Sequence, residues 1–216
     1  TPMWATSGSE FSGRPDDPDD WRDFCYVLAS RYHDRVDAWG FWNEPNLPQF
    51  WEGSRSQYLQ EILLPGIDAV RTVDPDAMVA GPDLAHLISA DWDDWLYDVV
   101  SQTRELLDVV THHAYPSDGT ASDVNDKLNE GGQYPWDPPS VRAVLDGAGW
   151  NDRPVWLTET GVQSHEYGEV GQESFYLDLL EDWFGNERDY TWLNRVFFYE
   201  MSDPGNSTDI SFGILE

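Results

Sequence analysis

Cysteine and positive charge are both scarce in this sequence. Its 216 residues include one cysteine, and 12 Lys and Arg stand against 41 Asp and Glu, which gives a formal net charge of −29. A lone Cys25 forms neither an internal disulfide framework nor a cysteine metal cage. The negative charge repels nucleic acids and anionic membranes, so neither is expected as a partner. A neutral partner, such as an oligo- or polysaccharide, suits this charge.

Several signatures are also missing. No run of about 18 apolar residues predicts a membrane span. The sequence contains no Gly-x-Ser-x-Gly elbow, no phosphate-binding loop ending in lysine and no dinucleotide fingerprint, which removes support for esterase, kinase and dehydrogenase functions. We therefore predict no cofactor. The compartment, secreted or cytoplasmic, and the oligomeric state stay open.

The sequence does contain short apolar runs that alternate with longer segments of helical period. This alternation is typical of β/α units around a parallel sheet, and we predict one domain over residues 1–216. Strands are expected at Pro2–Ala5, Val36–Trp42, Ala77–Gly81, Leu107–His113, Pro154–Glu159 and Arg195–Glu200. Helices are expected at Asp19–Tyr32, Arg55–Val73, Ala90–Thr103, Pro139–Gly147 and Gly171–Phe184, with loops at Ser7–Pro18, Pro116–Pro139 and Ser202–Ser211.

Two of these strands deliver a glutamate at their carboxyl end. Glu44 follows the aromatic run Trp39–Asn43, and Pro45 then prevents further ladder bonding. Glu159 follows the apolar run Pro154–Thr158. β/α barrels keep their chemistry at the carboxyl ends of the strands, so both side chains can face one cavity. Hydrolysis of a glycosidic bond needs such a pair, although the pattern alone leaves a surface or salt-bridge role equally open.

The motifs around these residues resemble those of clan A glycoside hydrolases, which are retaining β/α barrels. The carrying motifs are Trp42–Asn43–Glu44–Pro45, His113–Ala114–Tyr115–Pro116 and Thr158–Glu159–Thr160–Gly161, in that order. In this clan the Asn-Glu pair ends the fourth strand and the nucleophile ends the seventh. The pattern from Thr1–Ala5 through Asn46 to Phe50–Trp51 is most similar to family 39 and related xylosidase-like members.

The resemblance implies a role for several residues. It makes Glu44 the general acid/base, Glu159 the nucleophile and Asn43 the donor to the sugar 2-hydroxyl. It also implies that Tyr115 hydrogen-bonds the nucleophile and that His113 lies near the acid/base or the sugar. The expected activity is double-displacement hydrolysis of neutral, β-linked, xyloside- or glucoside-like glycans. The exact sugar, the linkage and endo or exo action stay open.

The resemblance also sets an expectation for the fold. A complete member is a (β/α)₈ TIM barrel, and this chain would hold about six of its strands, the third to the eighth. The first two βα units and the last helix would be missing. We therefore expect the isolated chain to be weakly active or inactive, because an open barrel leaves unpaired strand edges and part of the site without a wall.

Aromatic and histidine residues supply further candidates. Twelve tryptophans are present, and aromatic faces stack on sugar rings. At least one residue of Trp51, Tyr134 and Trp136 is predicted to form a sugar platform. Tyr199 and Glu200 are predicted to line the pocket. His112 and His113 are neighbours on a predicted strand and point to opposite faces, so His112 is expected to be structural.

Two other functions stay open. The chain could be a carbohydrate-binding barrel piece without catalysis, although the presence of both glutamates disfavours this. It could also be a metal-dependent barrel hydrolase that uses His113, Glu159 and Asp203. The preferred hypothesis involves no metal.

The excess of aspartate, with Lys127 as the single lysine, resembles the surfaces of halophilic proteins. We predict that the fold is lost on dilution from molar salt, because salt screens the repulsion between carboxylates. Circular dichroism melting curves from molar to millimolar NaCl test this. An ordinary acidic surface is the alternative, and it would show equal melting temperatures throughout.

Overall fold

Four parallel strands form one sheet in the computed structural model, which describes residues 5–9, 11–131, 138–151, 153–185, 190–203 and 211–214. In spatial and chain order these are β1 (Ala80–Ala85), β2 (Val109–His113), β3 (Val155–Thr160) and β4 (Leu193–Phe198). Every neighbouring pair is parallel, so each connection crosses over through helical segments. The prediction of β/α units around a parallel sheet is confirmed.

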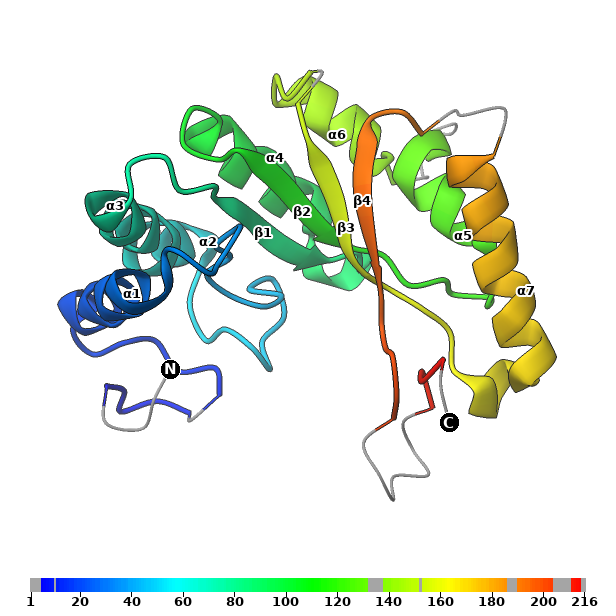
Figure 1. Cartoon of the computed structure of the whole chain (residues 1–216), viewed down its shortest axis with the longest axis horizontal. Coiled ribbons are helices and arrows are strands. Elements are labelled where there is room, and N and C mark those ends of the chain that lie inside the picture. The colour runs from blue at the N-terminus through cyan, green and yellow to red at the C-terminus, as the bar shows by residue number, and fades with distance from the viewer. Residues whose placement is uncertain are drawn as a thin grey trace.

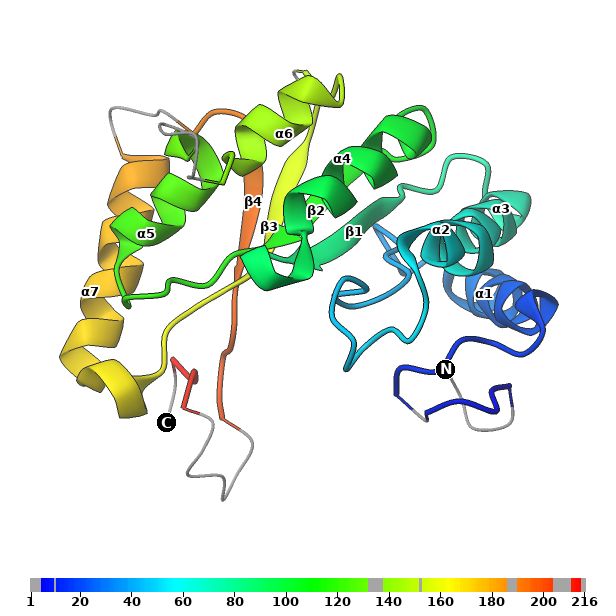
Figure 2. The ribbon, with the colours of Figure 1, turned by 180° about the vertical axis from the view of Figure 1, so that it is seen from behind.

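Helices pack on one face of the sheet and beyond both of its edges. Figure 2 shows α4 and α6 in front of the strands, and Figure 1 shows the opposite face, with α1 to α3 beyond β1 and α7 beyond β4. The α-helices are α1 (Pro18–Tyr32), α2 (Arg55–Tyr58), α3 (Leu64–Val73), α4 (Trp92–Thr103), α5 (Ala121–Asn125), α6 (Val141–Gly147) and α7 (Ser164–Phe184). The short π and 3₁₀ segments are η1 (Leu59–Leu63), η2 (Ile88–Ala90) and η3 (Asp126–Glu130).

All five predicted helices are present and end at the predicted residues, although four of them begin elsewhere. Asp17 caps α1 by accepting a hydrogen bond from the N–H of Asp19, and Pro18 begins the helix. Ser54 and Gln57 form a capping box at the start of α2. The predicted helix Arg55–Val73 is one helical run, in which a π-helical turn, η1, joins α2 to α3.

The strand predicted at Val36–Trp42 is wrong. Only an isolated bridge between Trp39 and Val79 forms there, because Trp39 alone bonds in both directions. Its N–H donates to Met78 O (3.0 Å), and its carbonyl accepts from the N–H of Ala80 (2.9 Å). The segment nevertheless runs beside β1 and places Glu44 near the carboxyl end of that strand. The predicted strand Ala77–Gly81 is displaced to β1, and most of Pro2–Ala5 lies outside the described residues.

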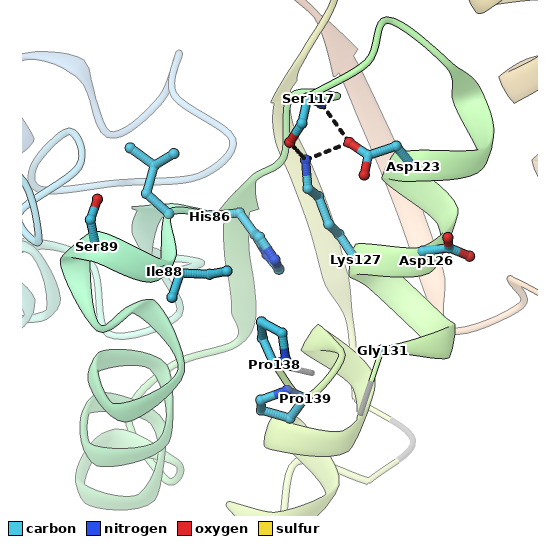
Figure 3. Close-up of a pocket in the computed structure, with 11 residues that line it drawn as sticks. His86, Ile88, Ser89, Ser117, Asp123, Asp126, Lys127, Gly131, Pro138 and Pro139 are labelled. Atoms are coloured by element: carbon cyan, nitrogen blue, oxygen red, sulfur yellow. Dashed lines mark hydrogen bonds and ion pairs between the residues drawn. The ribbon is translucent and has the colours of Figure 1, made fainter. Parts of the chain in front are cut away.

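The loop predicted at Pro116–Pro139 contains two helical segments, α5 and η3. Thr120 caps α5 by accepting from the N–H of Asp123. Lys127 Nζ then donates to Tyr115 O (2.7 Å), to Ser117 Oγ (2.8 Å) and to Asp123 Oδ2 (2.6 Å). These contacts fix the segment that follows β2. They also border a cavity of about 600 Å³, whose opposite wall includes His86 and Ile88 (Figure 3).

The buried face of the sheet packs against the helices through a continuous core. All five residues of β2 are buried. His112 is 1% exposed, lies 3.1 Å from His86 by ring nitrogens and packs near Trp92, so its predicted structural role agrees with its environment. Within the described part of the chain, no helix is long and apolar enough to cross a membrane.

Close packing of α3 against the segment before Glu44 depends on Gly66. A Cβ at Gly66 would lie 2.4 Å from Cδ1 of the buried Phe41 ring. We expect Gly66→Ala to lower the free energy of unfolding by about 1–3 kcal/mol, the usual cost of overpacking a core. Gly147→Ala is the matched control, because its Cβ would meet only ordinary contacts with Tyr97. Urea denaturation measures the free energy of unfolding of both variants. Equal values for Gly66→Ala and Gly147→Ala would contradict this packing.

Candidate active site

Glu44 is held at the end of β1 by backbone contacts. Its N–H donates to Asp83 O (2.9 Å), and its carbonyl accepts from the N–H of Leu47 (2.9 Å). The backbone of Glu44 has a φ of 45°, a left-handed conformation that costs a non-glycine residue about 1–3 kcal/mol. Asn46, which the sequence analysis did not single out, offsets this cost. Its side-chain amide donates to Ala85 O (2.8 Å) and accepts from Ala85 N–H (3.0 Å).

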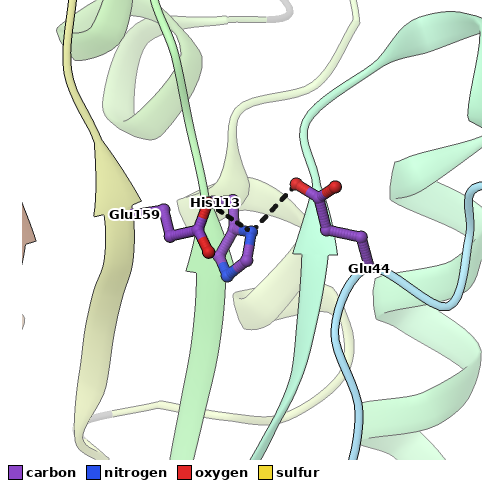
Figure 4. Close-up of side chains that lie close together, drawn as sticks. All are labelled: Glu44, His113 and Glu159. Atoms are coloured by element: carbon purple, nitrogen blue, oxygen red, sulfur yellow. Dashed lines mark hydrogen bonds and ion pairs between the residues drawn. The ribbon is translucent and has the colours of Figure 1, made fainter. Parts of the chain in front are cut away.

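Three side chains from separate segments meet at the carboxyl ends of the strands. Glu44, His113 at the end of β2 and Glu159 in β3 each offer an atom, and these atoms lie within 4.8 Å of one another. Nδ1 of His113 lies 2.9 Å from Glu44 Oε1 and 3.5 Å from Glu159 Oε2 (Figure 4). The two glutamates predicted to form a pair therefore do face each other, with an imidazole between them.

Tyr115, which follows β2, holds the side chain of Glu159 in place. Its hydroxyl donates a hydrogen bond of 2.8 Å to Glu159 Oε2, which is the contact that the resemblance implies. Burial, together with the negative charge of Glu159, raises the pKa of Tyr115, so the hydroxyl keeps its proton. The tyrosine is therefore a permanent donor to this carboxylate.

His113 carries the compensating charge of the site. Burial alone lowers the pKa of its ring, but interactions with Asp83 and Glu44 and the charge of Glu159 outweigh burial and raise the pKa to about 9. The side chain of His113 is 3% exposed, whereas those of Glu44 and Glu159 are 13% and 28% exposed. At neutral pH the ring of His113 is thus an imidazolium, and it lies between the carboxyl groups of Asp83, Glu44 and Glu159, of which the two glutamates are partly exposed.

Asp83 is part of this cluster and was missed by the sequence analysis. Its Oδ1 accepts a hydrogen bond from Thr158 Oγ1 (2.7 Å) and lies 3.8 Å from Nε2 of His113. The available signal was its position just after the apolar run Ala77–Gly81, where a strand was already expected.

The remaining predicted residues have mixed outcomes. Asn43 is exposed on the turn that carries Glu44, and Tyr199 is partly buried with its ring 6.4 Å from that of Tyr115. Trp51 is 2% exposed and packs edge-on against Trp42 and Tyr58. This burial contradicts its prediction as a sugar platform, because the core takes up the ring. Tyr134 and Trp136 lie outside the described residues.

The metal alternative is not assembled as predicted. Asp203 accepts a hydrogen bond from the N–H of Gly213 (2.7 Å) and does not join His113 and Glu159. Among the described residues, the grouping of ligand types that comes close enough for one ion is Glu44, His113 and Glu159. In this grouping Nδ1 of His113 already faces both carboxylates.

Solved structures show which fold this chain shares. A β-xylosidase from Caulobacter crescentus matches 97% of the chain with a TM-score of 0.70 and 18% identity, and 47% of that structure is covered. A glucosidase from Croceicoccus marinus matches 86% of the chain with a TM-score of 0.66 and 18% identity, and 38% of that structure is covered. Likenesses to family 39 structures indicate a TIM-barrel-like α/β fold, of which this chain shows a partial parallel sheet.

Sequence comparison identifies the family. The profile described as Glycosyl hydrolases family 39 matches residues 9–165, so the chain belongs to this family. A "Beta-xylosidase" of Geobacillus stearothermophilus is 34% identical over 93% of the chain, and a "Beta-xylosidase" of Caldicellulosiruptor saccharolyticus is 36% identical over 42% of the chain. The chain spans 43% of the Geobacillus stearothermophilus relative, so it covers less than half of that protein, and the second match covers 19% of the Caldicellulosiruptor saccharolyticus relative.

The raised pKa of His113 makes part of the stability depend on pH. Since the pKa is about 9 when folded and about 6.5 when unfolded, this contribution is complete below pH ~6.5 and is lost as pH rises toward 9. We expect the destabilisation caused by His113→Gln to shrink by about 3 kcal/mol between pH 6 and pH 9.5. Urea titrations at both pH values measure it. The exposed His165→Gln variant is the control, and a pH-independent effect of His113→Gln would refute the charge assignment.

Proposed function

We propose that this chain carries the catalytic pair of a retaining glycosidase that acts on neutral, β-linked, xyloside- or glucoside-like glycans. The observation that carries the proposal is the approach of Glu44 and Glu159, whose carboxylate oxygens come within 4.8 Å around His113. Retaining enzymes hold their two carboxyl groups about 5–5.5 Å apart, closer than enzymes that place a water between them. Membership of family 39 and two relatives named β-xylosidase support the same activity.

In the first step, Glu44 acts as the acid and Glu159 as the nucleophile. Glu44 gives its proton to the glycosidic oxygen while Glu159 attacks the anomeric carbon, so the bond to the leaving group breaks as a glycosyl ester forms. The hydrogen bond from Tyr115 occupies Oε2 of Glu159 and leaves Oε1 to attack. Nδ1 of His113 lies 3.5 Å from the same Oε2, so two side chains hold this carboxyl group in place for the attack.

In the second step, Glu44 acts as the base. It takes a proton from a water molecule that attacks the anomeric carbon, and Glu159 leaves as a carboxylate, so the configuration at that carbon is retained. Asn43 lies next to Glu44 and is exposed, which suits a donor to the sugar 2-hydroxyl. Such a contact accelerates the reaction only if it strengthens in the transition state.

The likeness to longer relatives favours a second candidate. Because the chain covers 43% of the first relative, it could bind sugars through its part of the cleft without turning them over. The proposed domain is one barrel unit over residues 1–216, and its sheet as described holds four strands. Calorimetry with xylo-oligosaccharides, run beside a hydrolysis assay, separates binding from catalysis.

Removal of the nucleophile tests the proposed function directly. We expect Glu159→Ala to reduce hydrolysis of p-nitrophenyl β-xyloside by about 10⁴-fold or more, the scale that follows loss of a covalent nucleophile. Azide should restore turnover by attacking from the vacated side and should yield the glycosyl azide with inverted configuration. Chromatography identifies this product.

Matched variants make the outcome specific. The exposed Glu169→Ala variant should keep the wild-type rate, and a chelator should leave that rate unchanged. Loss of activity on chelation would favour the metal-dependent alternative. Failure of azide rescue, together with failure of a fluorosugar to label Glu159, would remove the nucleophile assignment.

A further inference from the structure

Asp83 occupies an irregular position in β1. Pro82 pairs with Thr111 and Leu84 pairs with His112, so Asp83 is an extra residue that has no partner in the ladder. Its φ of 53° lies in the left-handed region, which aspartate tolerates better than most residues. Bulges of this kind turn a side chain away from its regular direction and are common next to active sites.

Backbone hydrogen bonds hold the bulge on both sides. The N–H of Asp83 donates to Thr111 Oγ1 (3.0 Å) on β2, and its carbonyl accepts from the N–H of Glu44 (2.9 Å). The same residue therefore connects the turn of Glu44 to the strand that carries His113. A change in its backbone would move both sides of the site.

The carboxylate of Asp83 is fixed as firmly as its backbone. Oδ1 accepts from Thr158 Oγ1 (2.7 Å), and Thr158 directly precedes Glu159. Oδ2 lies over Gly40, where an added Cβ would come within 3.4 Å of it. The side chain is 16% exposed, and Oδ1 lies 3.8 Å from Nε2 of His113. Nε2 and Nδ1 lie on opposite sides of the ring, so Asp83 and the glutamate pair flank the imidazole.

We propose that Asp83 is a positioning residue that acts through His113, because its fixed carboxylate holds the ring with Nδ1 toward Glu44 and Glu159. This inference rests on the proposed function and adds a residue to that site. Asp83 touches neither the reacting carbon nor the leaving oxygen in the proposed reaction. Its role is to keep the imidazole charged and oriented between the two acids.

The groups that face His113 make this role electrostatic. Asp83 faces Nε2, while Glu44 and Glu159 face Nδ1. The neighbouring His112 belongs to the opposite face, where burial keeps its pKa well below the usual value, so it adds no charge. Loss of the Asp83 charge should therefore lower the pKa of His113 from about 9. The imidazolium would then lose its proton at a pH closer to neutral.

Nuclear magnetic resonance of ¹⁵N-histidine-labelled protein tests the placement without any need for activity. The wild type should show His113 with both ring nitrogens protonated at pH 7, and His113→Gln assigns the signals. Asp83→Asn keeps the shape and can still accept from Thr158, but it removes the charge. We expect it to lower the pKa of His113 by about one unit or more.

A control variant and the wild-type spectrum show whether a change in the titration of His113 is specific to Asp83. Asp76→Asn removes the same charge from an exposed loop before β1 and should leave the titration of His113 unchanged. An identical titration in Asp83→Asn and wild type would overturn the proposal. If Asp83→Asn does not fold, the wild-type spectrum decides, since a neutral His113 ring at pH 7 would equally overturn it.

The activity of the same variants separates positioning from general damage. Because the ring of His113 should titrate at lower pH in Asp83→Asn, a limb of the kcat/KM profile should move with it, with a fall of about 10-fold at the optimum. A uniform fall with no movement of the limb would indicate a merely structural role and reject the proposal. If the wild type neither hydrolyses a glycoside nor is labelled at Glu159 by a fluorosugar, the proposed function fails, while the NMR titration still decides the role of Asp83.

Discussion

The interaction on which this site depends is the one between the buried imidazole of His113 and the carboxylates around it. Glu44, Glu159 and Asp83 would repel one another at these distances, and burial would penalise each charge. An imidazolium between them offsets both costs. The whole chain has a net charge of −29, and at this place a single imidazolium offsets part of the charge of three acidic side chains. The positive ring of His113 therefore reduces the repulsion that would otherwise keep the two glutamates apart.

The second constraint is the backbone that carries these groups. Glu44 and Asp83 both have left-handed φ values, and a hydrogen bond joins the N–H of one to the carbonyl of the other. Asn46 and Thr111 then tie the two residues to the sheet. Strain of this kind persists only where the surroundings fix it, and it is common at functional sites. The strand ends thus act as a rigid frame for the pair.

The two faces of the sheet give their side chains different surroundings, one apolar and covered by helices, the other acidic. His112 and His113 illustrate the division. His112 packs against His86 and Trp92 on the helix-covered face, where burial keeps it neutral. His113 emerges among acids at the carboxyl ends and is charged. Adjacent residues on one strand therefore have opposite electrostatic states, because side chains alternate across a sheet.

Sequence patterns were sufficient for the elements that local physics governs. Apolar runs predicted β2, β3 and β4 to within two residues at each end, and segments of helical period predicted the last residues of α1, α3, α4, α6 and α7. The two glutamates could be selected because each follows such a run, and the motif order pointed to the family. These signals lie within a few residues of one another, so a single sequence records them.

Only the tertiary structure decided what those residues meet. The bulge at Asp83 arises from the register between β1 and β2, and the burial of Trp51 arises from the packing of distant helices. The strand expected at Val36–Trp42 was reduced to one bridge, since pairing depends on a partner that is far away in the chain. The sequence by itself determined the chemistry that is available and where strands end. Long-range pairing and packing decided which charged groups lie close enough to interact.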